Sequence, residues 1–128
     1  MALTSLVAIV DDDESVRLAT ENLVRSLGHM PVTFSSAEAF LDSPCLERVE
    51  CLITDIRMPG MTGVQLQHTL LAQHRNLPII FMTGYPDARA GEKVLAAGAV
   101  GVLQKPFEGA EIVRCLTVAL NRSGAQQN

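Results

Sequence analysis

Five polar residues stand where short apolar runs of the chain end, and their side chains suit phosphoryl chemistry. They comprise three carboxylates, one hydroxyl and one ammonium: Asp11, Asp12, Asp55, Thr83 and Lys105. Clustered carboxylates need a counter-charge, and a divalent cation with oxygen ligands is the simplest one. A hydroxyl and a lysine close to them would suit the oxygens of an incoming phosphoryl group. The sequence therefore predicts a metal-assisted phosphate site if the fold gathers these residues.

Asp55 is the carboxylate that would act as the nucleophile, forming an aspartyl phosphate. Its charge repels the donor phosphate, and Mg²⁺, which prefers oxygen ligands, would offset that repulsion. We expect Asp12 and Asp55 to bind Mg²⁺ directly and Asp11 to bind it through water. The backbone carbonyl of Arg57 would complete the protein ligands. Such a site supplies positioning and charge neutralisation, which are the main requirements of phosphoryl transfer.

Two further side chains would contact the transferred group. Lys105 would pair with Asp55 at rest and with a phosphoryl oxygen after transfer, and Thr83 would donate a hydrogen bond to another phosphoryl oxygen. Taken singly, residues of these types are commonly caps, turn residues or surface residues. Their joint placement at four predicted strand ends is what favours a shared site.

Apolar runs alternate with amphipathic helical segments along the chain, which predicts strand–helix units. The expected strands cover about residues 6–11, 30–34, 50–54, 79–82 and 100–103. The expected helices cover about residues 14–27, 36–42, 63–74, 86–97 and 108–121. Such alternation with short loops is typical of a parallel sheet covered by helices on both faces. The predicted fold class is α/β: a single doubly wound (βα)5 flavodoxin-like domain with a five-stranded parallel sheet in the order 2-1-3-4-5.

The totals of the sequence limit the class of protein. The 128 residues fit one domain, which we place at 1–122, followed by a disordered tail at 123–128. A net charge of −4 and scattered basic residues argue against a nucleic-acid-binding surface. No segment approaches the ~20 apolar residues of a membrane helix, and the three cysteines are typical of thiols in a reducing compartment. We therefore expect a cytoplasmic protein that contacts neither nucleic acid nor membrane.

Four sequence blocks together resemble the CheY-like receiver domain of bacterial two-component response regulators, and they are most similar to FixJ-type receivers. The blocks span nearly the whole chain: IVDDDESVR, LITDIRMPGMTG, IIFMTGY and GAVGVLQKPF. The resemblance implies that Asp55 is the phosphoacceptor. It also implies that Thr83 is the switch hydroxyl and Lys105 the phosphate-binding lysine.

The same resemblance implies a metal site, a backbone geometry and a partner. Asp11 and Asp12 would be the acidic pair that serves Mg²⁺, with the Arg57 carbonyl as a further ligand. The Lys105–Pro106 peptide bond would be cis, which an X–Pro bond tolerates at modest cost. The donor would be a phosphohistidine of a sensor histidine kinase docked on the helix at 14–27. The chain would phosphorylate and dephosphorylate only itself, rather than act as an enzyme on an external substrate.

The resemblance places the output on the face formed by the segments at 86–97, 100–103 and 108–121. This face would bind a downstream effector domain or protein, or a second copy of the chain in a homodimer. Gly91 weakens the helix at 86–97 by up to ~1 kcal/mol relative to Ala, so we expect this helix to shift or order on phosphorylation. FixJ-type receivers usually precede a DNA-binding domain, so the chain is either a stand-alone receiver or one excised from a longer regulator.

Two positions need separate consideration. Val102 stands three residues before Lys105, where the family commonly carries a Tyr or Phe that moves inward when the switch hydroxyl engages phosphate. A valine does not make that exchange, which keeps a second function open: a phosphate sink or a phosphorylation-independent binding module. Tyr85 is the only tyrosine, and it would either shield the phosphoryl group or lie on the surface.

The first block also admits another class of aspartyl-phosphate protein. An Asp-x-Asp pair, here Asp11 and Asp13, resembles the motif of haloacid-dehalogenase phosphatases, with Asp11 as nucleophile and Asp13 as acid/base. Glu14 follows where that class has a hydrophobic residue or Thr, and Asp55 would have no role. The aspartate that carries the phosphoryl group distinguishes the two classes.

Overall fold

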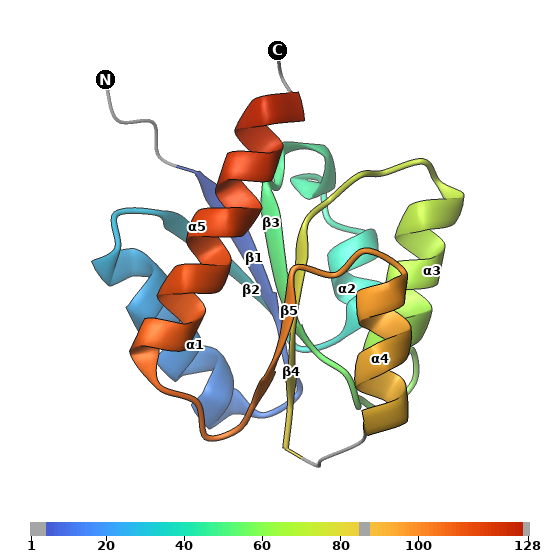
Figure 1. Cartoon of the computed structure of the whole chain (residues 1–128), viewed down its shortest axis with the longest axis horizontal. Helices are drawn as coiled ribbons and strands as arrows, with labels where there is room; N and C mark the ends of the chain where they lie inside the picture. Colours follow the sequence, from blue (N-terminus) through green and yellow to red (C-terminus); the bar gives the residue numbers. More distant parts are fainter. Residues whose placement is uncertain (1–4, 85–87, 127–128) are drawn as a thin grey trace.

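A parallel sheet forms the centre of the computed structural model, which describes residues 5–84 and 88–126 (Figure 1). The strands are β1 Leu6–Val10, β2 Met30–Phe34, β3 Cys51–Asp55, β4 Ile79–Thr83 and β5 Gly101–Gln104. They are hydrogen-bonded in the order β2-β1-β3-β4-β5, and every neighbouring pair is parallel. The predicted fold class and strand order are confirmed. The order reverses between β1 and β3, which is where sheets of this kind bind ligands.

Helices cover both faces of the sheet. Their bounds are α1 Glu14–Ser26, α2 Ala37–Leu41, α3 Gly63–Ala72, α4 Ala88–Ala96 and α5 Gly109–Gln126. The helices α1 and α5 lie on one face, whereas α2, α3 and α4 lie on the other (Figure 1). No helix within residues 5–84 and 88–126 has both the length and the apolar character needed to cross a lipid bilayer.

The strand sequences are continuously apolar because both faces of the sheet are buried. Val7 and Ile9 of β1 pack with residues of α1 and α5, whereas Ala8 and Val10 pack with residues of α2 and α3. All four side chains are completely buried. Successive side chains of a strand point to opposite faces, so the run LVAIV contributes to two hydrophobic cores. The polar residue that follows the run is thereby placed at the edge of the sheet.

Local signals fix both ends of α1. The Oδ1 of Asp13 accepts hydrogen bonds from the backbone N–H groups of Ser15 at 2.9 Å and Val16 at 3.3 Å, which makes Asp13 the N-cap. Gly28 follows the helix with φ 88°, a left-handed conformation that glycine adopts easily. Because Asp13 caps the helix, the carboxylate of Asp12 is not used there.

The C-terminal end of the chain differs from the prediction. The last helix was expected to end near residue 121, but α5 continues to Gln126, so residues 123–126 are helical where a disordered tail was expected. The reason is that Gly124 costs a helix only ~1 kcal/mol, while Ala125 and Gln126 favour it. Residues 127 and 128 lie outside the described part, and the domain limit at 122 stays a prediction. A short 3₁₀ turn, Leu46–Arg48, was not predicted.

Three leucines in or directly after the helices are accessible to solvent rather than buried. Leu27, Leu71 and Leu95 are 36%, 44% and 47% exposed. Short helices that lie flat on a sheet bury only a narrow stripe, such as Thr20 and Val24 in α1. Apolar residues at the margin of that stripe therefore stay in contact with solvent.

Candidate functional site

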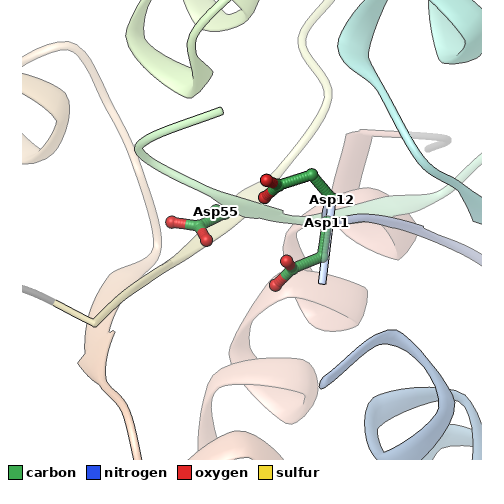
Figure 2. A group of neighbouring side chains, drawn as sticks. All are labelled: Asp11, Asp12 and Asp55. Atoms are coloured by element: carbon green, nitrogen blue, oxygen red, sulfur yellow. The ribbon is translucent and has the colours of Figure 1, made fainter. Parts of the chain in front are cut away.

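Three carboxylates meet at the carboxyl ends of β1 and β3 (Figure 2). Asp55 is the last residue of β3, and Asp11 and Asp12 directly follow β1. One carboxylate oxygen from each residue lies within 4.8 Å of the other two. Asp11 is completely buried and Asp55 is 7% exposed, whereas Asp12 is exposed. The fold therefore gathers the predicted acidic cluster and leaves it accessible at Asp12.

The ammonium group of Lys105 lies between two of these carboxylates. Its Nζ donates hydrogen bonds to Oδ2 of Asp55 at 2.8 Å and to Oδ2 of Asp11 at 3.0 Å. The pairing with Asp55 was predicted, and the contact with Asp11 was not. Burial alone would lower the pKa of Lys105, but the hydrogen bonds to Asp55 and Asp11 outweigh it and raise this pKa above the ordinary value. Lys105 is therefore charged and offsets part of the negative charge of the cluster.

Asp11 is the most deeply buried carboxylate of the cluster. Burial raises the pKa of Asp11 above its ordinary value of 3.8, and the charge of Asp55 adds to the increase. The backbone N–H of Asp13, which donates to Oδ1 of Asp11 at 2.9 Å, and the Lys105 ammonium act in the opposite direction. Lys105 pairs with two of the three clustered carboxylates, so the cluster has the charge and the all-oxygen donor set that suit a hard divalent cation such as Mg²⁺.

Backbone pairing fixes the position of Lys105 relative to Thr83. Thr83 is the last residue of β4, is 5% exposed and pairs with Gln104 of β5. The backbone N–H of Lys105 then donates to the carbonyl oxygen of Thr83 at 2.8 Å. The Lys105–Pro106 peptide bond is cis, as predicted. Thr83 thus ends the strand next to the one that carries Asp55, and its role toward a phosphoryl group stays a prediction.

Hydrogen bonds to Asp55 and to a residue of α2 position the loop that follows Asp55. The backbone N–H of Arg57 donates to Oδ1 of Asp55 at 3.1 Å. From α2, Oε2 of Glu38 accepts a hydrogen bond from the N–H of Met61 at 3.1 Å. Sequence reasoning missed Glu38, because the bond joins residues 23 positions apart and no local pattern marks it. The metal-ligand role of the Arg57 carbonyl stays a prediction.

Arg17 is a second residue that sequence reasoning missed. Its Nη1 donates to the backbone carbonyl oxygen of Asp11 at 2.8 Å, so α1 supports the loop that carries the acidic pair. The available signal was an arginine in the first turns of the helix that follows the aspartates. The guanidinium also brings a positive charge close to a strongly acidic loop.

Gly63 sets how closely α3 approaches Asp55. The helix begins with a capping box between Thr62 and Gln65, and a Cβ on Gly63 would clash with the backbone oxygen of Asp55. We expect Gly63→Ala to lower the free energy of unfolding by about 1–3 kcal/mol, because the backbone of the Asp55 loop must move. Urea unfolding checks this value. Gly109→Ala is the matched control, since within the described residues its Cβ would meet Leu23 Cδ1 alone, at 3.9 Å. Equal losses for the two variants would contradict the prediction.

The comparisons with known proteins identify the family. The family described as "Response regulator receiver domain" matches residues 7–117. The chain is 38% identical to response regulator protein TodT of Pseudomonas putida over 124 residues, which is 97% of this chain and 55% of TodT. It is 36% identical over 120 residues to transcriptional regulatory protein FixJ of Azorhizobium caulinodans, covering 94% of this chain and 57% of FixJ. The chain belongs to the receiver domain family of response regulators.

Solved structures agree with that assignment. The structure titled FixJ-N superimposes with a TM-score of 0.84 at 35% identity, covering 94% of this chain and 96% of that one. Response regulator StyR superimposes with a TM-score of 0.87 at 37% identity, covering 98% of this chain and 63% of that one. The chain spans little more than half the length of the curated relatives named above. The predicted resemblance to FixJ-type receivers is confirmed.

Val102 occupies a half-buried position on β5 beneath α4. A Cβ on Gly91 of α4 would lie 4.0 Å from Cγ1 of Val102, so the two residues face each other across the helix–sheet contact. The valine packs against the core that α2, α3 and α4 share. Tyr85, the other position singled out in the sequence, lies outside the described residues.

Proposed function

We propose that this receiver domain accepts a phosphoryl group on Asp55 from a phosphohistidine of a sensor histidine kinase, in a reaction that requires Mg²⁺. The observation that carries the proposal is the position of Lys105, whose ammonium bridges Asp55 and Asp11 at 2.8 and 3.0 Å beside an acidic cluster. Such a cation can exchange a carboxylate oxygen for a phosphoryl oxygen without a large movement. Intact-mass measurement after incubation with acetyl phosphate and Mg²⁺ tests the proposal, and one added phosphoryl group is expected.

Each residue of the site has a role in this proposal. An oxygen of Asp55 attacks phosphorus while the phosphohistidine nitrogen leaves, so that one P–N bond breaks and one P–O bond forms. Asp11, Asp12 and Asp55, with the Arg57 carbonyl, would hold Mg²⁺, which supplies charge neutralisation for the transferred group. Lys105 and Thr83 would each bind a phosphoryl oxygen. The domain is regulatory, and the only reactions assigned to it are its own phosphorylation and dephosphorylation.

Mg²⁺ should stabilise the folded chain, because the cluster that would bind it exists only in the folded state. At a Mg²⁺ concentration 100-fold above Kd, the free energy of unfolding should rise by about 2.7 kcal/mol. Asp12→Asn should reduce this rise, since it removes an exposed charge from the cluster. Asp42→Asn changes an exposed aspartate at the end of α2 and is the control. Thermal unfolding with and without Mg²⁺ measures both, and an undiminished shift in Asp12→Asn would place the metal elsewhere.

An apolar groove beside Lys105 supports docking of the kinase on α1. It has a volume of about 440 Å³ and lies between α1 and the segment that follows β5. The residues that line it are Val16, Ala19, Thr20, Leu23, Lys105, Pro106, Phe107 and Gly109. Lys105 lines this groove and contacts Asp55, so a partner bound in the groove would lie close to the phosphoacceptor. This agrees with the expectation that the kinase contacts α1.

The output surface in this proposal is the face of α4, β5 and α5. It would change when Thr83 and Lys105 engage the phosphoryl group, and it would then bind an effector domain or protein, or a second copy of the chain. Leu95 of α4 and Val118 of α5 are 47% and 46% exposed, which supplies apolar contact area for such a partner.

Val102 favours one second candidate function. The strand β5, GVLQ, carries no aromatic side chain that could move inward when Thr83 binds phosphate, so phosphorylation could leave the α4–β5–α5 face unchanged. The domain would then serve as a phosphate sink or as a phosphorylation-independent binding module. Backbone chemical shifts of α4 and β5 with and without a phosphoryl analogue at Asp55 separate the two functions.

A further inference from the structure

A buried glutamine connects α3 to α4. Gln67 lies in the middle of α3 and is 2% exposed. Its Nε2 donates a hydrogen bond to the backbone carbonyl oxygen of Val94 at 3.0 Å. Val94 is the buried residue of α4 and is completely inaccessible to solvent. The bond therefore joins the two helices inside their contact.

The carbonyl that Gln67 binds belongs to the C-terminal cap of α4. The N–H of Ala99 donates to the same Val94 oxygen at 3.0 Å, and the N–H of Gly98 donates to the oxygen of Leu95 at 3.0 Å. With Gly98 at φ 107°, these bonds form a Schellman motif. In addition, Nη1 of Arg122 in α5 donates to the oxygen of Gly98 at 3.3 Å. The C-terminal end of α4 is thus fixed to α3 and to α5.

The N-terminal half of α4 makes a different contact. There Gly91 faces Val102, because a Cβ on Gly91 would lie 4.0 Å from Cγ1 of Val102. The glycine has no side chain that could interlock with the valine. The amide oxygen Oε1 of Gln67 is buried and accepts no hydrogen bond within the described residues. Gln67 also lines a cavity of about 140 Å³. The hydrogen bond from Gln67 to Val94 thus joins α3 to α4 within the described residues, and a cavity lies next to it.

Gln67 also lies on a direct connection from the phosphoacceptor loop. The first residue of α3, Gly63, donates its N–H to the carbonyl oxygen of Ile56 at 2.9 Å, and a Cβ there would press on the oxygen of Asp55. One rigid helix of ten residues thus runs from the Asp55 loop past Gln67. A displacement of that loop would reach the cap of α4 through α3.

We propose that Gln67 is a positioning residue that fixes the C-terminal end of α4 to α3, so that α4 reorients about this end when Asp55 is phosphorylated. The anchoring of α4 by Gln67 concerns the unphosphorylated protein and does not depend on the proposed function. The reorientation rests on the proposed function.

The resting protein tests the anchor without any phosphoryl group. Gln67→Met keeps the side-chain length and removes both the bonded Nε2 and the unpaired Oε1, so the fold is expected to persist. Hydrogen exchange should become about tenfold faster at the amides of Gly98 and Ala99, while amides of β1 and β3 stay unchanged. Gln73→Met alters an exposed glutamine at the end of the same helix and is the control. Unchanged exchange at Gly98 and Ala99 in Gln67→Met would overturn the anchor.

Loading with beryllofluoride and Mg²⁺ tests the reorientation. In the wild type, changes in backbone chemical shift should be concentrated at residues 88–92 and small at 94–96. In Gln67→Met they should spread over the whole of α4, and an identical pattern in the two proteins would overturn the reorientation. Intact mass after acetyl phosphate is measured in parallel for both. If neither protein gains a phosphoryl group and the shifts do not respond, the proposed function and the reorientation fail together, and the exchange rates still decide the anchor.

Discussion

Asp55→Asn is expected to abolish phosphoryl incorporation completely. The amide occupies nearly the same volume as the carboxylate, so the site keeps its shape, but the amide lacks the anionic oxygen that attacks phosphorus. The substitution also removes one of three clustered negative charges and leaves Lys105 paired with Asp11. We therefore expect a folded protein whose intact mass is unchanged after acetyl phosphate and Mg²⁺.

The control for this experiment makes the same aspartate-to-asparagine change at a position outside the site. Asp42→Asn replaces an exposed aspartate and should gain one phosphoryl group, as the wild type does. Full labelling of Asp55→Asn would contradict the assignment. It would direct attention to Asp11 and Asp13, the pair that the phosphatase alternative uses.

Lys105→Met is expected to slow labelling by acetyl phosphate by about 100-fold, which is the usual effect of removing one donor from a developing anionic group. The methionine keeps the length of the side chain and loses the ammonium that contacts Asp55 at 2.8 Å. Lys93→Met is a well-matched control, since Lys93 is the only other lysine of the chain and is exposed on α4. Equal labelling rates for the two variants would show that Lys105 has only a resting role.

Lys105→Met should also reduce stability, because the buried carboxylate of Asp11 loses its cation. Removing one partner of a buried ion pair costs about 3 kcal/mol. Burial already raises the pKa of Asp11 above 3.8, and loss of the lysine should raise it further. A carboxyl group with a raised pKa in the folded state destabilises the protein at pH values above that folded-state pKa. It has no such effect at pH values below the pKa that it has in the unfolded chain. The difference in unfolding free energy from the wild type should therefore be large at pH 7 and shrink as the pH falls toward 4, and a constant difference would contradict this cause.

The residues at strand ends could be predicted from the sequence because the signals are local. Asp11, Asp55 and Lys105 each follow an apolar run, and a parallel sheet brings the ends of such runs to one edge. The same logic gave the strand order and the pairing of Lys105 with Asp55. The capping box at Thr62 and Gln65 was also a local signal, although it was not used in the prediction.

Contacts between helices and loops were not predictable in this way. Glu38 reaches the loop at Met61, and Gln67 reaches the cap of α4 at Val94, across 23 and 27 positions of the chain. Neither residue type indicates a partner by itself, because an exposed glutamate and a glutamine on a helix are both common. Only the packing of α2, α3 and α4 on the sheet decides which backbone groups they meet.

The measurement that tests the function most directly locates the acyl phosphate in the chain. After incubation with acetyl phosphate and Mg²⁺, borohydride reduces an aspartyl phosphate to homoserine, and peptide mass spectrometry then identifies the changed residue. We expect homoserine at position 55 and aspartate at positions 11, 12 and 13. Homoserine at position 11, or no homoserine at any position, would contradict the proposal that Asp55 accepts the phosphoryl group.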